Sequence, residues 1–250
     1  MYCNLPCGRD SIQEIDAAVG TIMKAVKDQG ALDNTIVWFT SDNGPRGGPV
    51  GTNQIGNSGP FRGFKGTIFE GGWRVPSIVY WHKKIPRKKV MEITSSLDIY
   101  NTLMRLSGSR EIGENDGLDI SHLLLNSSDS KENRPERSVF LYYFRDSQSG
   151  RSSAVRHQQY KLITQTDLTP LPKPLLYNLE LDPGEAVDLY DVGEFRKVRD
   201  DILALKEAEE AAVVWSRKVV LAKDPSAMPC CSPGCHSKTH LLPLRNCCRC

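Results

Sequence analysis

The sequence lacks a long apolar run and a net charge. No stretch of its 250 residues approaches the roughly 18 consecutive apolar residues that a membrane-spanning helix needs, so we expect no membrane span. The 32 basic and 30 acidic side chains nearly cancel, which argues against a general nucleic-acid or membrane-surface role. Internal repeats and low-complexity linkers are absent too, which leaves an ordinary globular chain long enough to bury a core.

Cysteine is scarce until the last 21 residues, which hold six of the eight. Such crowding indicates either disulfides or a metal site, and adjacent Cys-Cys pairs place two sulfurs poorly around one tetrahedral zinc ion. We therefore expect a disulfide-bonded tail, with its pairing left open, formed by Cys230, Cys231, Cys235, Cys247, Cys248 and Cys250. Disulfides imply an oxidising compartment, yet the segment Met1–Cys7 has no apolar core of the signal-peptide kind. We assign no role to Cys3 and Cys7.

The N-terminal third has the pattern of an α/β domain. Apolar residues recur every three or four positions between Ser11 and Gln29, after a capping box at Ser11 and Glu14, and Gly30 is a natural end for this helix. The run Thr35–Thr40 is β-branched and aromatic without alternation, which predicts a strand buried on both faces, as in a parallel sheet.

The sequence Ser41-Asp42-Asn43-Gly44 follows this strand directly. Chemistry in α/β sheets collects at the carboxyl ends of strands, and a carboxylate beside a carboxamide offers hard oxygen ligands to a divalent cation. The alternative is an ordinary turn, because Asp-Asn-Gly is also good turn chemistry.

A glycine-rich segment, residues 59–76, comes next and holds five glycines, three cations and one acid. Glycine at this density lets the backbone approach a ligand closely, and Lys65 within it could supply a point charge for an oxyanion. By itself, Lys65 could equally be a solvated loop lysine.

The two segments together resemble the second half of a sulfatase of the arylsulfatase A and N-acetylgalactosamine-6-sulfatase type. The resemblance rests on Ser-Asp-Asn-Gly followed by Gly-x-Lys-x-x-x-x-Glu-Gly-Gly-x-Arg-x-Pro, which is Gly63–Pro76 here. It implies an alkaline-phosphatase-like α/β fold and sulfuric ester hydrolysis. It also implies that Asp42 and Asn43 bind calcium or magnesium and that Lys65 binds the sulfate of the ester. Glu70 and Arg74 would orient the loop through a charge pair.

The sulfatase nucleophile motif, Cys-x-Pro-Ser-Arg, is missing from this sequence. The resemblance therefore predicts a C-terminal half with part of an active site and no nucleophile, inactive alone, whose partner would be the missing N-terminal half or a second copy. Its site would take a sulfate ester, and its location would be lysosomal or secreted. The sequon at Asn126 is a candidate glycosylation site.

Three parts are expected along the chain: residues 1–135 as the end of the catalytic α/β domain, 136–225 as a small C-terminal subdomain, and 226–250 as the tail. Residues 95–106 predict a helix with Leu97, Tyr100, Leu103 and Leu106 on one side. Four short β runs, at 138–144, 152–156, 159–164 and 175–179, predict an antiparallel sheet. A long helix follows from about residue 195 to residue 221, with an inner stripe at Val198, Ile202, Leu205, Ala212 and Val219.

Two other functions stay open. The chain could be a catalytically dead sulfatase derivative that acts as a binding or interaction module, which the missing nucleophile favours. It could also be a phosphatase-like metalloenzyme, although the loop around Lys65 resembles sulfatases more closely.

Overall fold

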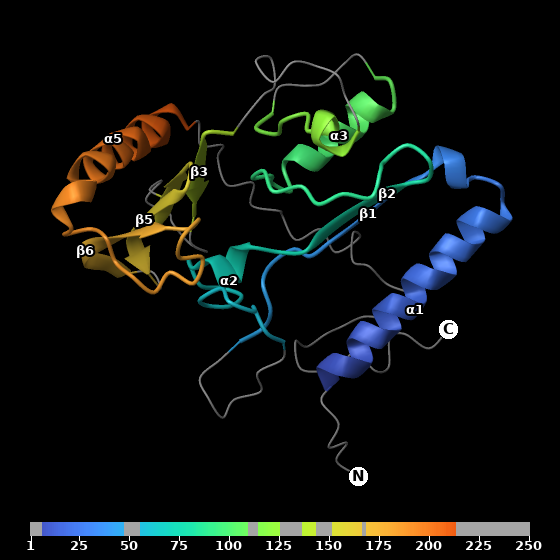
Figure 1. The fold of residues 1–250 in the computed structure, drawn as a ribbon, viewed down its shortest axis with the longest axis horizontal. Coiled ribbons are helices and arrows are strands. Elements are labelled where there is room, and N and C mark those ends of the chain that lie inside the picture. Colours follow the sequence, from blue (N-terminus) through green and yellow to red (C-terminus); the bar gives the residue numbers. More distant parts are fainter. Residues whose placement is uncertain are drawn as a thin grey trace, which may run out of the picture. The chain divides into compact units, whose positions relative to one another are not determined.

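The computed structural model describes residues 7–47, 56–109, 115–125, 137–143, 152–166 and 169–213. The elements in chain order are α1 (Cys7–Asp28), η1 (Leu32–Asn34), β1 (Ile36–Thr40), α2 (Glu70–Trp73), β2 (Ser77–Trp81), α3 (Asp98–Leu106), α4 (Ser121–Leu124), β3 (Val139–Tyr142), β4 (Ala154–His157), β5 (Tyr160–Thr166), β6 (Thr169–Asn178), η3 (Gly193–Phe195) and α5 (Arg196–Ala212) (Figure 1). None of the described helices is long and apolar enough to cross a membrane. The boundaries expected at residues 135 and 225 stay predictions.

Helix α1 begins at Cys7, ahead of the predicted start at Ser11. Its end is where the sequence places it. Gly30 has a left-handed φ of +66°, and its N–H donates to the carbonyl of Lys27 at 2.9 Å. Glycine is favoured at such a helix end because it has no Cβ to clash in this conformation.

Strand β1 forms as expected, but its predicted surroundings are wrong. It pairs antiparallel with β2, with Ile36 opposite Trp81 and Thr40 opposite Ser77. Its residues are half-buried or exposed, and Phe39 at the exit keeps 39% of its surface exposed. Within the described residues this sheet has only two strands, and neither of them is buried on both faces.

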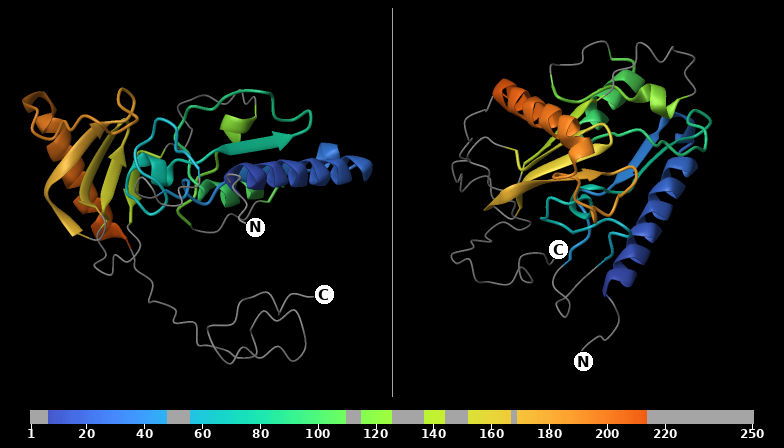
Figure 2. Two further views of the ribbon diagram at one scale, coloured as in Figure 1. Left: turned by 90° about the horizontal axis from the view of Figure 1, so that it is seen from below. Right: turned by 60° about the vertical axis from the view of Figure 1, so that its left-hand side comes forward.

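The C-terminal sheet has four antiparallel strands in the order β3-β4-β5-β6, which confirms the small antiparallel sheet. Strand β6 is longer than predicted and begins at Thr169. Helix α5 covers one face of this sheet (Figure 2), where Ile202 is 2% exposed and packs with Val155, Leu162 and Leu176. In the predicted inner stripe of α5, Val198 and Leu205 are half-buried, Ala212 is exposed, and Val219 lies outside the described residues.

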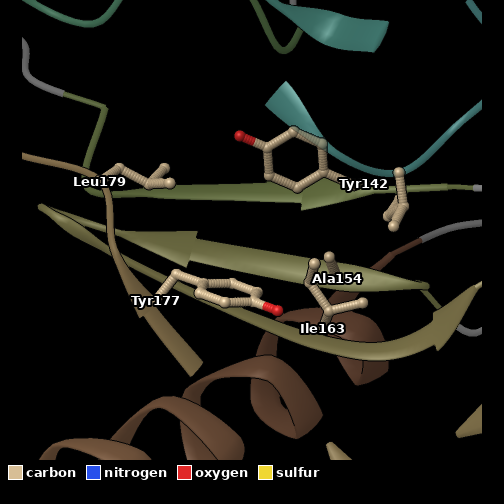
Figure 3. Close-up of a cluster of buried hydrophobic side chains, with 6 residues drawn as sticks. Tyr142, Ala154, Ile163, Tyr177 and Leu179 are labelled. Atoms are coloured by element: carbon tan, nitrogen blue, oxygen red, sulfur yellow. The ribbon is translucent and has the colours of Figure 1, made fainter. Parts of the chain in front are cut away.

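The other face of the sheet packs against the segment before α2. Ile68 is 1% exposed there, and Phe69 packs beside it against a cluster formed by Tyr142, Ala154, Ile163, Tyr177 and Leu179 (Figure 3). Period-two alternation explains the two faces, since Leu162 points towards α5 while its neighbour Ile163 points towards the α2 segment. The glycine-rich segment is therefore anchored on the small sheet.

Helix α3 begins at Asp98 and buries a face that the sequence did not predict. Leu97 and Tyr100 are 54% and 55% exposed, whereas the fully buried residues are Asp98, Asn101 and Thr102. These polar groups bind the backbone of the following loop: Asp98 accepts from the N–H of Leu118 at 2.8 Å, and Thr102 accepts from that of Ile120 at 3.0 Å. The buried face is polar because it satisfies loop amides that would otherwise lack partners.

Candidate functional site

The segment after β1 forms a tight turn. The Ser41 hydroxyl donates to the carbonyl of Asn43 at 2.9 Å, and the Gly44 N–H donates to the carbonyl of Gly72 at 2.9 Å. A Cβ added at Gly44 would lie 1.8 Å from the carbonyl oxygen of Gly71, so only glycine fits this close approach. The turn is thus pressed directly against the glycine-rich segment.

Residues 62–74, which we call the lysine loop, fold back on themselves at the same place. The Gly71 N–H donates to the carbonyl of Arg62 at 2.7 Å, and the Lys65 N–H donates to the carbonyl of Pro45 at 2.9 Å. Two segments that the sequence singled out separately are therefore joined by backbone hydrogen bonds. The side chains of Asp42 and Lys65 are exposed, and that of Asn43 is half-buried.

A divalent cation would find only part of a site in the described residues. Asp42 and Asn43 offer carboxylate and carboxamide oxygens, the donor type that calcium and magnesium take, but calcium takes about 6–8 such oxygens. Across the described segments, no group of three or more His, Cys, Asp or Glu residues could hold a metal ion. These two side chains therefore do not complete a cation site.

Glu70 is buried, at 3% exposure, and its expected charge pair with Arg74 is wrong. Its carboxylate instead lies 3.0 Å from Nζ of Lys161 and 3.7 Å from a guanidinium nitrogen of Arg156. The Arg74 guanidinium stacks over the ring of Phe61, 4.7 Å from its centre. The burial of Glu70 explains the change of partner, because a desolvated carboxylate needs a cation inside the same low-dielectric region.

Lys161 is fully buried at the centre of this arrangement. Its ammonium lies 2.9 Å from the carbonyl oxygen of Ile68, 3.0 Å from Oε1 of Glu70 and 2.9 Å from Oε1 of Glu185. We call Glu70, Arg156, Lys161 and Glu185 the ionic cluster. It contains two carboxylates and two cations, so its formal charges balance.

Glu185 joins the cluster to the backbone of the lysine loop. Its Oε2 accepts from the N–H of Glu70 at 2.7 Å. Burial raises the pKa of the Glu185 carboxyl above its ordinary value, although Lys161 and this hydrogen bond oppose the shift. Burial likewise raises the pKa of the Tyr142 hydroxyl, and the nearby charge of Glu70 adds to the effect.

Sequence reasoning missed Lys161, Arg156 and Glu185. One signal was present for Lys161: in the strand Tyr160–Thr166 it shares alternation phase with Ile163, which places it on an inward face. Glu185 carried no comparable signal, since it reads as the end of an Asp-Pro-Gly-Glu surface turn. Asn126, Cys3 and the six tail cysteines lie outside the described residues, and their assignments stay predictions.

Comparison with known proteins identifies the family. Residues 4–109 match the family model described as Sulfatase, and residues 59–211 match that described as N-sulphoglucosamine sulphohydrolase, C-terminal. Human arylsulfatase A is 35% identical across 96% of this chain and 50% of its own length. The N-acetylgalactosamine-6-sulfatase of the dog is 29% identical across 90% of this chain and 47% of its own. The chain thus spans about half the length of these curated relatives.

Solved structures agree with the sequence relatives. The PsFucS1 sulfatase from Pseudoalteromonas sp. superimposes with a TM-score of 0.66 and 29% identity, over 81% of this chain and 42% of the other. The fold is therefore that of a sulfatase over most of this chain. Together, the residue pattern, the two family models and the shared fold show that this chain belongs to the sulfatase family.

Proposed function

We propose that this chain supplies the sulfate-binding lysine and part of the cation site of a sulfuric ester hydrolase. The observation that supports this most directly is the hydrogen bonding of the lysine loop to the turn after β1, through Lys65 to Pro45 and Gly44 to Gly72. It joins, on neighbouring backbone, the two segments that carry the family resemblance.

Lys65 has the chemistry for the sulfate end of an ester. Its ammonium is a compact point charge, and charge moves onto the sulfate oxygens and the leaving oxygen in the transition state. We assign Lys65 to bind the sulfate, and Asp42 and Asn43 to bind calcium or magnesium. A divalent cation, when bound, would supply a Lewis acid for the sulfate oxygens.

The rest of such a site would come from sequence outside this chain, because Cys-x-Pro-Ser-Arg does not occur in it. Exposed apolar side chains support a covering partner: Ile12, Ile15 and Ile22 on α1, Ile78 on β2, Leu97 directly before α3 and Tyr100 on α3. A two-stranded sheet is also marginal by itself in water. We propose that this partner is the N-terminal half of a sulfatase domain, with a second copy of this chain as the alternative.

The compartment follows from the same proposal. A sulfatase with a disulfide-bonded tail would mature in an oxidising compartment, so we propose a lysosomal or secreted location.

A catalytically dead binding module is the second candidate. The missing nucleophile motif favours it, because removing the nucleophile of a hydrolase can cost about 10⁶-fold in turnover. In that case Lys65 could still bind a sulfate group without any hydrolysis.

A chimera separates the two candidates. This chain would replace the matching half of human arylsulfatase A, and hydrolysis of a generic aryl sulfate would be measured for the chimera and for the chain alone. We expect the chain alone to be inactive and the chimera to be active. Lys65→Ala should then lower the turnover of the chimera by about 10²-fold or more, as loss of one stabilising donor does elsewhere.

Lys89→Ala is the matched control, because Lys89 is also an exposed loop lysine but lies outside the lysine loop. It should leave turnover unchanged. A folded chimera with no turnover would favour the binding module. Equal turnover with and without Lys65 would contradict the role assigned to that residue.

A further inference from the structure

The small C-terminal sheet contacts the lysine loop through charged groups as well as apolar ones. We propose that Lys161 and Glu185 are positioning residues that hold the lysine loop and, through it, the turn bearing Asp42 and Asn43; their importance for catalysis rests on the function proposed above. The proposal gives the small sheet a part in organising the site.

The contacts run without a break from the sheet to the turn. Glu185 accepts from the N–H of Glu70, the first residue of α2, at 2.7 Å, and Lys161 binds the carboxylate of the same Glu70 at 3.0 Å. Two residues further on, the carbonyl of Gly72 accepts from the N–H of Gly44 at 2.9 Å. A shift of Glu70 would therefore also move the Gly72 carbonyl, to which the turn after β1 is hydrogen-bonded.

Lys161 cannot itself contact a substrate. It is 0% exposed, its ammonium donates to the carbonyl of Ile68 and to Oε1 of Glu70, and it lies 2.9 Å from Oε1 of Glu185 as an ion pair. Any effect on the site has to pass through the loop, which distinguishes Lys161 from the exposed Lys65.

Glu185 has a strained backbone conformation, which indicates that its side chain is needed at this position. Its φ is +53°, in the left-handed region that a non-glycine residue adopts only at an energetic cost. Asn, Asp or Gly would fit this turn position more easily. The glutamate side chain, however, is long enough to reach both Lys161 and the Glu70 N–H, and this explains why it stands there.

The same turn touches the start of the lysine loop in two further places. A guanidinium nitrogen of Arg62 donates to the carbonyl of Glu185 at 3.1 Å. A Cβ added at Gly184 would lie 3.1 Å from the carbonyl oxygen of Pro60. The turn at residues 182–185 therefore contacts the chain just before and at the start of the lysine loop, at residues 60–62, and again within the loop at residue 70.

Apolar packing alone would hold this loop less specifically. Ile68 and Phe69 pack on the sheet, and the ring of Trp73 meets that of Tyr142 edge-on at 5.1 Å. Such contacts have little directional preference, whereas a buried ion cluster with satisfied donors fixes one register. We therefore propose that the apolar contacts attach the lysine loop to the C-terminal sheet and that the ionic cluster fixes its position on that sheet.

Amide hydrogen exchange measured by mass spectrometry tests whether Lys161 and Glu185 hold the lysine loop. The full chain can be used alone or in complex with a partner, because each peptide is identified by its own sequence. In Glu185→Gln, we expect amides at residues 42–47 and 62–74 to exchange at least about tenfold faster, as loss of a charged hydrogen bond predicts. Glu185→Asp should give the same result. Aspartate keeps the charge and suits the left-handed backbone, but its side chain is about 1.5 Å too short to reach Glu70.

Glu210→Gln is the matched control. Glu210 is also a largely buried glutamate, and it binds Lys206 at 2.7 Å and the N–H of Ser152, away from the lysine loop. It should speed exchange near residue 152 and in α5, and leave the loop unchanged. The proposal is overturned if loop exchange is unchanged in Glu185→Asp, or if Glu210→Gln accelerates it equally. The readout does not involve sulfate, so loss of the proposed function would leave this result interpretable.

Discussion

Lys65 and Lys161 show how differently two lysines of one chain can be used. Lys65 lies exposed on a glycine-rich loop, where an ammonium remains available to an anionic ligand. Lys161 is enclosed by oxygens inside the protein and balances two buried carboxylates. A buried ion pair contributes little net stability, but removing one partner leaves an unpaired charge. We therefore assign Lys161 to positioning the lysine loop rather than to stabilising the fold.

The pH dependence of stability should report the buried Glu185. Burial raises the pKa of its carboxyl above the ordinary 4.5 in the folded protein, so the folded state holds this proton more tightly than the unfolded state. The contribution of the Glu185 carboxyl to the free energy of unfolding therefore falls as pH rises from about 4.5 through the raised pKa. Relative to Glu185→Gln, the wild type should lose free energy of unfolding over that interval. Urea titrations of both proteins between pH 4 and pH 7 measure the difference.

Glu210 gives the opposite sign and serves as the control for that experiment. Burial raises the pKa of Glu210, but hydrogen bonds from Lys206 and Ser152 outweigh burial and lower the pKa overall. Its stabilising contribution is present above the ordinary pKa and is lost as pH falls. The wild type should thus gain stability relative to Glu210→Gln as pH rises. A gain relative to Glu185→Gln as well would show that Lys161 and the hydrogen bond from the Glu70 N–H outweigh burial and lower the pKa of Glu185.

The elements of the C-terminal part are held by a sheet with two different faces. One face packs on α5 through aliphatic side chains, and the other carries the apolar cluster and the ionic cluster that meet the lysine loop. Strand alternation assigns each residue to a face, so a single strand serves both purposes. Helix α3 shows a different arrangement, because its buried residues are the polar Asp98, Asn101 and Thr102 while its apolar residues are half-buried or exposed.

Ile202 should be the main anchor of α5. It is 2% exposed against Val155, Leu162 and Leu176, and truncation would leave a cavity in this layer. We expect Ile202→Ala to lower the free energy of unfolding by about 2–5 kcal/mol, measured by urea titration. Leu181→Ala is the control, because Leu181 is 83% exposed, and its change should stay within about 0.5 kcal/mol. Equal effects of the two substitutions would mean that α5 is not anchored through Ile202.

The whole molecule leaves apolar side chains exposed on several elements of its α/β part. Ile12 on α1, Ile78 on β2 and Leu97 directly before α3 are 68%, 62% and 54% exposed, whereas the C-terminal sheet is covered on both faces. A short uncharged strand of high β propensity with an open edge is an aggregation hazard. These exposed side chains and this open edge are the reason for the covering partner proposed above.

We expect the chain alone to self-associate and to become soluble when produced with the N-terminal half of a related sulfatase. Light scattering after size-exclusion chromatography measures both states. Ile78→Lys should reduce self-association, because a charge on an open strand opposes edge pairing. Leu181→Lys, at an exposed position of the covered subdomain, should not. A monomer that unfolds cooperatively without a partner would show that the small α/β sheet is self-sufficient.

The sequence by itself determined the local features of this protein. The left-handed helix end at Gly30, the tight turn at Asp42 and Asn43, and the four strands of the C-terminal sheet follow from glycine chemistry and short-range periodicity. The candidate sulfate ligand, Lys65, could be named because its family pattern lies within one short stretch of sequence.

Only the tertiary structure decided the rest. The antiparallel pairing of β1, the polar buried face of α3 and the partners of Glu70 all depend on residues far away along the chain. Glu70 and Arg74 are close in sequence and opposite in charge, which made a pair between them the natural expectation. Burial overrides that proximity, because a desolvated carboxylate is stabilised by whichever cation the fold encloses with it, and here that cation is Lys161.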